Sequence, residues 1–275
     1  KITSFDSDGF GVGNDANVNQ SSTNIVSWSW KANGSGSANT DGSINSTVSV
    51  NTTAGFSIVS YTGNGSAGAT IGHGLGATPA VIIQKIRSST GNWLVYHHKN
   101  TSAPETDFLK LNTTDATADE VTIFNDTAPT SSVFSVGTES TINGNGNTCI
   151  AYCFAEKTGY SKFGQYTANA AVDGNFIYTG FKPTFVLIKS SNSAQAGQDW
   201  FIYDSVRDTG NAATQTLQPN TSSAEETNVA PIDILSNGFK LRTNTGRING
   251  TSGEYIYMAF GQSLVGSNNV PCTAR

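Results

Sequence analysis

The stretch TPAVIIQK at residues 78–85 decides the fold, because the chain contains it twice. NWLVYH at 92–97 follows it, and the second half of the chain runs KPTFVLIK at 182–189 and then DWFIYD at 199–204. The two pairs are offset by about 105 residues. A fixed offset shared by separate landmarks indicates a tandem duplication.

The closing part of each unit repeats as well. Residues 133–156 match 238–262 at nearly the same offset, and residues 9–32 have the internal spacing of 133–155. We therefore expect a third, partial copy at the start, which implies a longer parent polypeptide. The predicted organisation is a closing hairpin of an upstream unit at 1–32, a Gly/Ser/Asn/Thr-rich linker or loosely held strand at 33–54, full repeats at 55–157 and 158–264, and a tail at 265–275.

The composition favours strands over helices. Charged residues make up 13% of the chain, about half the usual share, while β-branched and aromatic residues are plentiful. Short apolar runs alternate with turn residues, which predicts an all-β fold of two tandem antiparallel β-sandwiches, jelly-roll-like or immunoglobulin-like. The expected strands are residues 56–61, 80–85, 93–97, 121–124 and 149–154, with counterparts at 163–166, 185–189, 200–203, 232–235 and 255–260.

The closing strand of each unit predicts where the core lies. Side chains alternate across a strand, so Ile150, Tyr152 and Phe154 share one face, and we expect that face to meet the core. The opposite face is also apolar, which predicts cover on both sides. The equivalent sets are Val26, Trp28 and Trp30 in the partial copy and Ile256, Met258 and Phe260 in the second repeat, and the opposite face of the first repeat carries Cys149, Ala151 and Cys153.

Charge and cysteine content exclude several classes of partner. The net charge is −5 and no dense Lys/Arg cluster occurs, so we expect no nucleic acid as partner. No apolar run approaches the roughly 20 residues of a membrane span, so we expect no membrane. Cys149 and Cys153, four apart on a strand, would lie roughly 13 Å apart, beyond disulfide reach, and they are predicted to be small buried residues. No cofactor or metal is expected.

The loop at 72–76 carries three glycines around His73, as a phosphate loop or ligand site would. The second repeat has no histidine there but keeps a glycine, Gly180 for Gly76, shortly before a proline and an apolar strand. Glycine permits a positive φ, so we interpret the loop as a turn before a strand, with His73 left as a candidate local ligand.

Recurring aromatic residues are the remaining candidates for ligand binding. The two tryptophans hold equivalent positions, where the alternatives are core packing and stacking on sugar rings. The acidic pairs at 119–120 and 225–226 are expected in solvated loops, and His97 and His98 at solvated strand ends, so no catalytic residue and no metal ligand is predicted. The candidate sugar-stacking residues are Trp93, Tyr96, Trp200, Tyr203 and His73.

The chain resembles a repeat of virion appendage proteins of marine bacteriophages, found downstream of concanavalin-A-like lectin domains. The resemblance runs from Phe5 to Phe260 and rests on a set of short motifs. These include FDSDGFGVG, IVSWSWKA, FSIVSYTGNG, IGHGLGATPAVIIQK, VFSVG, IAYCFAE, GYSKFGQYT, YTGFKPTFVLIK, LSNGFKLR and YIYMAF.

The resemblance implies a non-enzymatic structural or adhesive part of a tail fibre, spike or capsid surface, on the outside of the virion. It supplies no catalytic residues. We expect other virion proteins as partners, a host surface glycan as a further partner, and a homo-oligomer, with a trimer favoured. The alternative function is a stand-alone carbohydrate-binding, lectin-like module.

Overall fold

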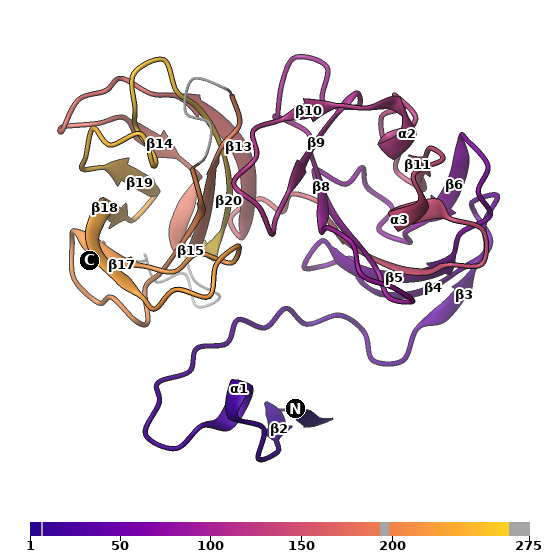
Figure 1. Cartoon of the computed structure of the whole chain (residues 1–275). Helices are drawn as coiled ribbons and strands as arrows, with labels where there is room; N and C mark the ends of the chain where they lie inside the picture. Colours follow the sequence, from indigo (N-terminus) through magenta and orange to yellow (C-terminus); the bar gives the residue numbers. More distant parts are fainter. Residues whose placement is uncertain (7, 193–197, 264–275) are drawn as a thin grey trace. The chain divides into compact units, whose positions relative to one another are not determined.

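The structure, a computed structural model, describes residues 1–6, 8–192 and 198–263 and confirms the all-β fold class. The chain divides into two compact units, Lys1–Lys31 and Ala32–Arg275. The larger unit holds two hydrophobic cores. We call the part from β3 to β12 the first sandwich and the part from β13 to β20 the second sandwich (Figure 1).

The small unit is a hairpin followed by one helical turn. β1 (Ile2–Phe5) pairs with β2 (Phe10–Val12), and Asp15 caps α1 (Ala16–Asn19). The strand expected around Val26, Trp28 and Trp30 is wrong, since residues 24–33 have no strand assignment. A strand needs a partner for its N–H and C=O groups, and the described ladder of this unit joins β1 to β2 alone.

The main layer of the first sandwich is an eight-stranded sheet of order β10-β9-β8-β7-β12-β5-β4-β3. Two of its strands lie in the segment predicted as linker 33–54, and Val48 of that segment is buried in the core, so only part of it is a linker. The strands are β3 (Ser37–Asn39), β4 (Ser46–Asn51), β5 (Phe56–Thr62), β7 (Val81–Ile86), β8 (Leu94–His97), β9 (Asp107–Lys110), β10 (Ala118–Asp119) and β12 (Thr148–Phe154).

The second layer of this sandwich contains β6 (Ala69–Gly72), β11 (Val133–Val136) and two helical turns. One of them, α2 (Val121–Phe124), replaces a predicted strand, so that prediction is wrong. Glu120 caps this turn, its side chain accepting from the Thr122 N–H, and Asn125 ends it in the left-handed conformation. The other is α3 (Ser140–Asn143).

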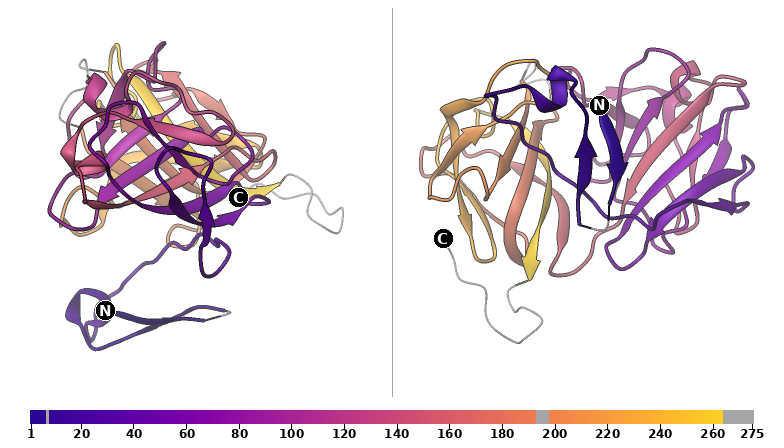
Figure 2. Two further views of the ribbon diagram at one scale, coloured as in Figure 1. Left: turned by 90° about the vertical axis from the view of Figure 1, so that its right-hand side faces the viewer. Right: turned by 90° about the horizontal axis from the view of Figure 1, so that it is seen from below.

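The second sandwich has two four-stranded sheets, and its strands lie at the left of the right-hand view in Figure 2. Their orders are β13-β20-β15-β16 and β14-β19-β18-β17, and the first matches β5-β12-β7-β8 of the first sandwich. The strands are β13 (Ser161–Thr167), β14 (Phe176–Tyr178), β15 (Phe181–Ser190), β16 (Trp200–Asp204), β17 (Ala213–Thr216), β18 (Glu226–Leu235), β19 (Gly238–Leu241) and β20 (Glu254–Ser263).

Equivalent hydrogen bonds fasten both sandwiches. Tyr61 donates its hydroxyl to the Ile142 carbonyl at 2.8 Å, and Tyr166 donates to the Ile248 carbonyl at 2.8 Å. The turn predicted at Gly76 and Gly180 also recurs, with φ of 66° and 86°. The two halves therefore share topology and local detail, as duplication of one unit requires.

The closing strand is oriented opposite to the prediction. Cys149, Ala151 and Cys153 are fully buried in the first core, while Ile150 and Tyr152 point to the outer face and are half-buried. Small side chains suit a strand that runs through the centre of a sheet packed against a second layer. Cover on both sides is confirmed for the second sandwich, where Ile256, Met258 and Phe260 are buried on the outer face.

Candidate functional site

The candidate sugar-stacking residues do not come together. His73, Tyr96, Trp200 and Tyr203 are buried, and Trp93 alone of the five is half-exposed. Tyr96 belongs to the first core and Tyr203 to the second. A ring that stacks on a sugar must present a face to solvent, and these four rings present almost none.

His73 and Tyr203 are fastened by bonds within their own sandwiches. Nε2 of His73 lies 3.2 Å from the Thr130 carbonyl oxygen, and Nδ1 accepts from the Leu75 N–H at 3.2 Å. Burial lowers the pKa of His73, so the ring is neutral. Tyr203 donates to the Ala230 carbonyl at 2.7 Å. Both side chains therefore support loops and strands.

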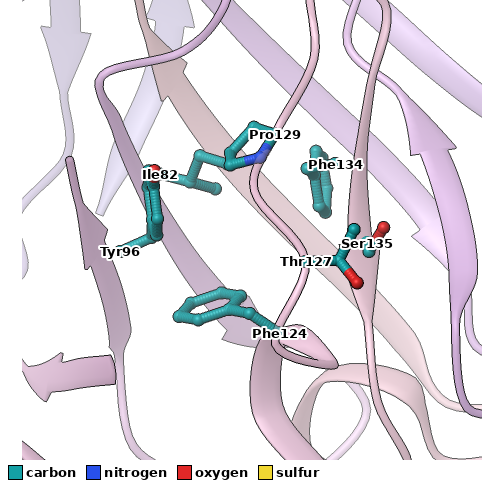
Figure 3. Close-up of a pocket in the computed structure, with 7 residues that line it drawn as sticks. All are labelled: Ile82, Tyr96, Phe124, Thr127, Pro129, Phe134 and Ser135. Carbon is teal, nitrogen blue, oxygen red and sulfur yellow. The ribbon is translucent and has the colours of Figure 1, made fainter. Parts of the chain in front are cut away.

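Tyr96 lines a narrow recess between the main sheet and the second layer of the first sandwich (Figure 3). Its ring meets Phe124 edge to face at 5.7 Å, and Phe134 closes the other side. The recess is too narrow to admit a water molecule. It offers no room for a ligand.

The structure does bring polar residues together where the two sandwiches meet. Nε2 of His97 lies 3.2 Å from the Tyr257 carbonyl oxygen, and its Nδ1 accepts from the Lys99 N–H at 3.1 Å. Nδ1 is thus unprotonated and Nε2 donates. Burial lowers the pKa of His97 to about 3, in keeping with this neutral ring. The predicted solvated strand end is wrong for His97, because the second sandwich covers it.

His98 makes a second contact of the same kind. Its Nε2 lies 2.8 Å from the Phe163 carbonyl oxygen, and Glu156 accepts from the Phe163 N–H at 2.9 Å. Burial lowers the pKa of His98, while the Phe163 carbonyl and the Glu156 carboxylate oppose that shift. Adjacent histidines of the first sandwich therefore hold two strands of the second.

Two side chains of the second sandwich donate hydrogen bonds to the first sandwich. Trp200 Nε1 donates to the Lys110 carbonyl at 3.0 Å, and Lys189 Nζ donates to the Thr114 carbonyl at 3.1 Å and to the Gln198 carbonyl at 2.6 Å. Lys189 is fully buried, and burial lowers its pKa to about 8. Three carbonyls therefore satisfy two polar groups on an otherwise apolar sheet face.

An aromatic cluster surrounds these bonds. Phe154 packs against Phe163 at 6.2 Å and against Phe260 at 5.7 Å, both edge to face. Phe56 stacks on Phe154 at 4.9 Å, and Phe185 meets Phe260 at 6.1 Å. Such pairs contribute about 0.5–1.5 kcal/mol each beyond the area they bury. We call this cluster, with His97, His98, Lys189 and Trp200, the joint.

The described residues of the two sandwiches leave part of the outer sheet face of the first sandwich half-exposed. Trp93 stacks on Tyr152 at 6.3 Å. Burial raises the pKa of Tyr152, and the exposed Arg87 opposes that shift. A shallow polar groove of about 360 Å³ adjoins them, lined in part by Thr47, Ser60, Thr148 and Arg87. We call the half-buried set Ile58, Ile83, Lys85, Trp93, Ile150 and Tyr152 the open face.

The acidic pair at 225–226 is not simply solvated. Glu225 pairs with Arg207, which also binds the buried carboxylate of Asp204, and Glu226 pairs with Arg247. Asp119 and Glu120 are exposed, as predicted. Among the described residues no group of three His, Cys, Asp or Glu side chains is placed to hold a metal ion.

Sequence reasoning missed the joint. Its one available signal was Lys189, a charged residue that directly follows the apolar run at 185–188. His97 and Tyr257 are 160 residues apart, so no local pattern could pair them.

The fold and the joint define an all-β protein of two sandwiches packed through their outer sheet faces. The chain belongs to the family described as a domain of unknown function (DUF7483), whose model matches residues 1–263. No curated protein matches the chain, and no solved structure matches it. Within the described residues, no helix has the length and apolar character to cross a membrane.

Proposed function

We propose that this chain is a non-enzymatic structural and adhesive module of a bacteriophage virion appendage, displayed on the particle surface. The motif set between Phe5 and Phe260 supports this by its resemblance to such proteins. The joint is the structural observation that carries it. A module built to hold position needs its parts fixed against one another, and here side chains of the joint link the two sandwiches.

The hydrogen bonds of the joint favour a structural role, because they hold the two sandwiches in a fixed arrangement. Histidine, lysine and tryptophan donors each meet a backbone carbonyl, so the contact depends on main-chain geometry. The low share of charged residues also makes the surface less sensitive to ionic strength. Partners of the proposed module are other virion proteins, further copies of the chain in a symmetric oligomer, and a host surface glycan.

Localisation on particles tests the proposal directly. Fab fragments raised against the purified chain are expected to label one site on phage particles in electron micrographs, and the chain is expected in peptide maps of gradient-purified particles. Blocked adsorption of Fab-coated particles would support the adhesive role. Absence of the chain from purified particles would refute the proposal, with a Fab against the major capsid protein as the positive control.

Glycan binding alone is the second candidate, and Trp93 is the observation that favours it. Its ring is half-exposed and stacks on Tyr152, a residue close enough to Arg87 of the polar groove for that charge to lower its pKa against the effect of burial. Aromatic rings next to hydroxyl and guanidinium groups suit a sugar. Binding on a glycan array that is lost in Trp93→Ala would support this candidate. Trp200→Phe, at the buried equivalent, is the control for a change that alters the joint and leaves the open face intact.

A further inference from the structure

The same sheet face exists twice in this chain, once covered and once open. In the second sandwich it is buried against the first, and in the first sandwich each equivalent residue is half-exposed. The ladders fix the equivalence, since Tyr152 pairs with Ile58 and Ile83 as Met258 pairs with Phe163 and Leu187. The pairs are Ile58/Phe163, Ile83/Leu187, Lys85/Lys189, Trp93/Trp200, Ile150/Ile256 and Tyr152/Met258.

Two donors on the open face lack the partners that their equivalents have. Lys85 Nζ donates to the Gly91 carbonyl at 2.5 Å, as Lys189 does to Gln198, but Lys189 has a second bond to Thr114. Trp93 Nε1 has no hydrogen-bond partner among the described residues, whereas Trp200 Nε1 binds the Lys110 carbonyl. Lys85 Nζ and Trp93 Nε1 can therefore each donate one further hydrogen bond to a carbonyl group.

The segment that covers the second sandwich also has an equivalent. Residues 110–117 supply the covering carbonyls, and residues 218–225 hold the same place in the second sandwich. Trp93 N–H donates to Asn112 Oδ1 at 2.8 Å, and Trp200 N–H donates to Asn220 Oδ1 at 3.0 Å. Most of residues 219–225 are exposed. The second sandwich therefore presents an equivalent and largely exposed segment, in which Glu225 also pairs with Arg207.

Charge distinguishes the two contacts. In the joint, the Thr117 N–H donates to the Ser191 carbonyl at 2.9 Å. Register places Glu225 at the position of Thr117 and Arg87 at that of Ser191. Superposing the joint on the open face therefore brings an acidic side chain to an exposed arginine. Opposite charges at such a rim favour association.

We propose that the open face binds residues 218–225 of a second copy of this chain, head to tail, with Glu225 of one copy beside Arg87 of the next. The contact is weaker than the joint, because Asp204 stands in place of His97 and is already paired with Arg207. A contact that uses two different surfaces leaves a free end on each side, so chains add in series. The proposal does not rest on a virion location.

Sedimentation velocity of the full chain tests this. From about 1 to 200 µM we expect reversible association with a dissociation constant of about 10–100 µM, within the range of transient interfaces. Arg87→Glu and Glu225→Arg are each expected to weaken association about tenfold or more, since they place like charges together. An equimolar mixture of the two variants restores opposite charges at every contact and is expected to recover association. Lys99→Glu, at an exposed lysine outside the open face, is the matched control.

A concentration-independent monomer would overturn the proposal, as would association that neither variant changes. Failure of the variant mixture to associate, while each variant retains the wild-type circular dichroism spectrum, would also overturn it. Arg87→Ser copies the residue at the equivalent position and gives a second, milder variant. A monomer whose Trp93 fluorescence responds to a glycan would identify the open face as a sugar site.

Discussion

Nε2 of His97 lies 3.2 Å from the carbonyl oxygen of Tyr257, so a side chain of the first sandwich is bonded to β20, an inner strand of the second. The same ring accepts from the Lys99 N–H. A proton on Nδ1 would face that N–H and remove the acceptor. The joint therefore requires neutral His97.

Stability is expected to fall as the pH drops through the histidine range. Burial lowers the pKa of His97 to about 3 and also lowers the pKa values of His73 and His98. Unfolded histidines have a pKa near 6.5, so below that pH the unfolded state binds protons that the folded state does not. The free energy of unfolding then declines by at most about 1.4 kcal/mol per pH unit for each such histidine.

His97→Gln isolates this residue, because a glutamine amide can still donate to Tyr257 and does not titrate. We expect urea denaturation between about pH 6.5 and 5 to show a shallower loss of stability in the variant than in the wild type. Equal slopes would assign the pH dependence to other groups.

Phe154 is expected to control whether the sandwiches unfold together. Phe154→Ala removes a buried ring that touches Phe56, Phe163 and Phe260, at a cost of about 3–5 kcal/mol. Calorimetry is expected to show separate transitions for the two sandwiches in this variant. Phe134→Ala, inside the first core, is the control for a lost ring that leaves the joint intact. A single transition in Phe154→Ala would contradict this role.

Replacing Asn143 by aspartate is expected to destabilise the protein. Its amide donates to the Ser66 carbonyl at 2.9 Å and to the Gly137 carbonyl at 2.7 Å, and the side chain is fully buried. Asn143→Asp replaces the donor by an acceptor, and we expect a loss of about 3 kcal/mol or more. Asn145→Asp, at an exposed position nearby, should change stability by less than about 0.5 kcal/mol. Chemical denaturation of both variants at neutral pH checks the difference.

The two tryptophans provide an internal comparison. Trp200→Phe removes the bond to the Lys110 carbonyl and part of a buried ring, at an expected cost of about 2 kcal/mol. Trp93→Phe removes a half-exposed ring with a free N–H and should cost less than about 1 kcal/mol. Urea denaturation of dilute protein measures both. Equal costs would mean that the joint does not depend on the indole bond.

The duplication and the all-β fold could be predicted because both depend on local patterns. Pro79 and Pro183 mark the same turn, and the apolar runs after them form β7 and β15. The segment 121–124 failed, because four apolar or β-branched residues indicate a strand while the capping groups Glu120 and Asn125 decide for a helical turn.

The sequence could not choose between the two apolar faces of the closing strand. Alternation puts Ile150, Tyr152 and Phe154 on one face and Cys149, Ala151 and Cys153 on the other, and the prediction assigned the wrong one of these two apolar faces to the core. The larger set lies on the outer face, where Phe154 enters the joint. Contact between the sandwiches depends on residues far apart in the chain. The alternation of side chains along one strand therefore cannot indicate which face makes that contact.

In each full repeat, residues 55–157 and 158–264, the opening strand is hydrogen-bonded to the closing strand: β5 pairs with β12 and β13 with β20. Roughly 90 residues must leave the ribosome before β5 meets its partner, and loop closure over that length is slow. Until β12 has been synthesised, β5 and β7 each have one edge without a strand partner. In the second repeat, β13 and β15 have an equivalent unpaired edge until β20 has been synthesised. Swapping of closing strands between repeats is therefore the misfolding route to which this architecture is most exposed.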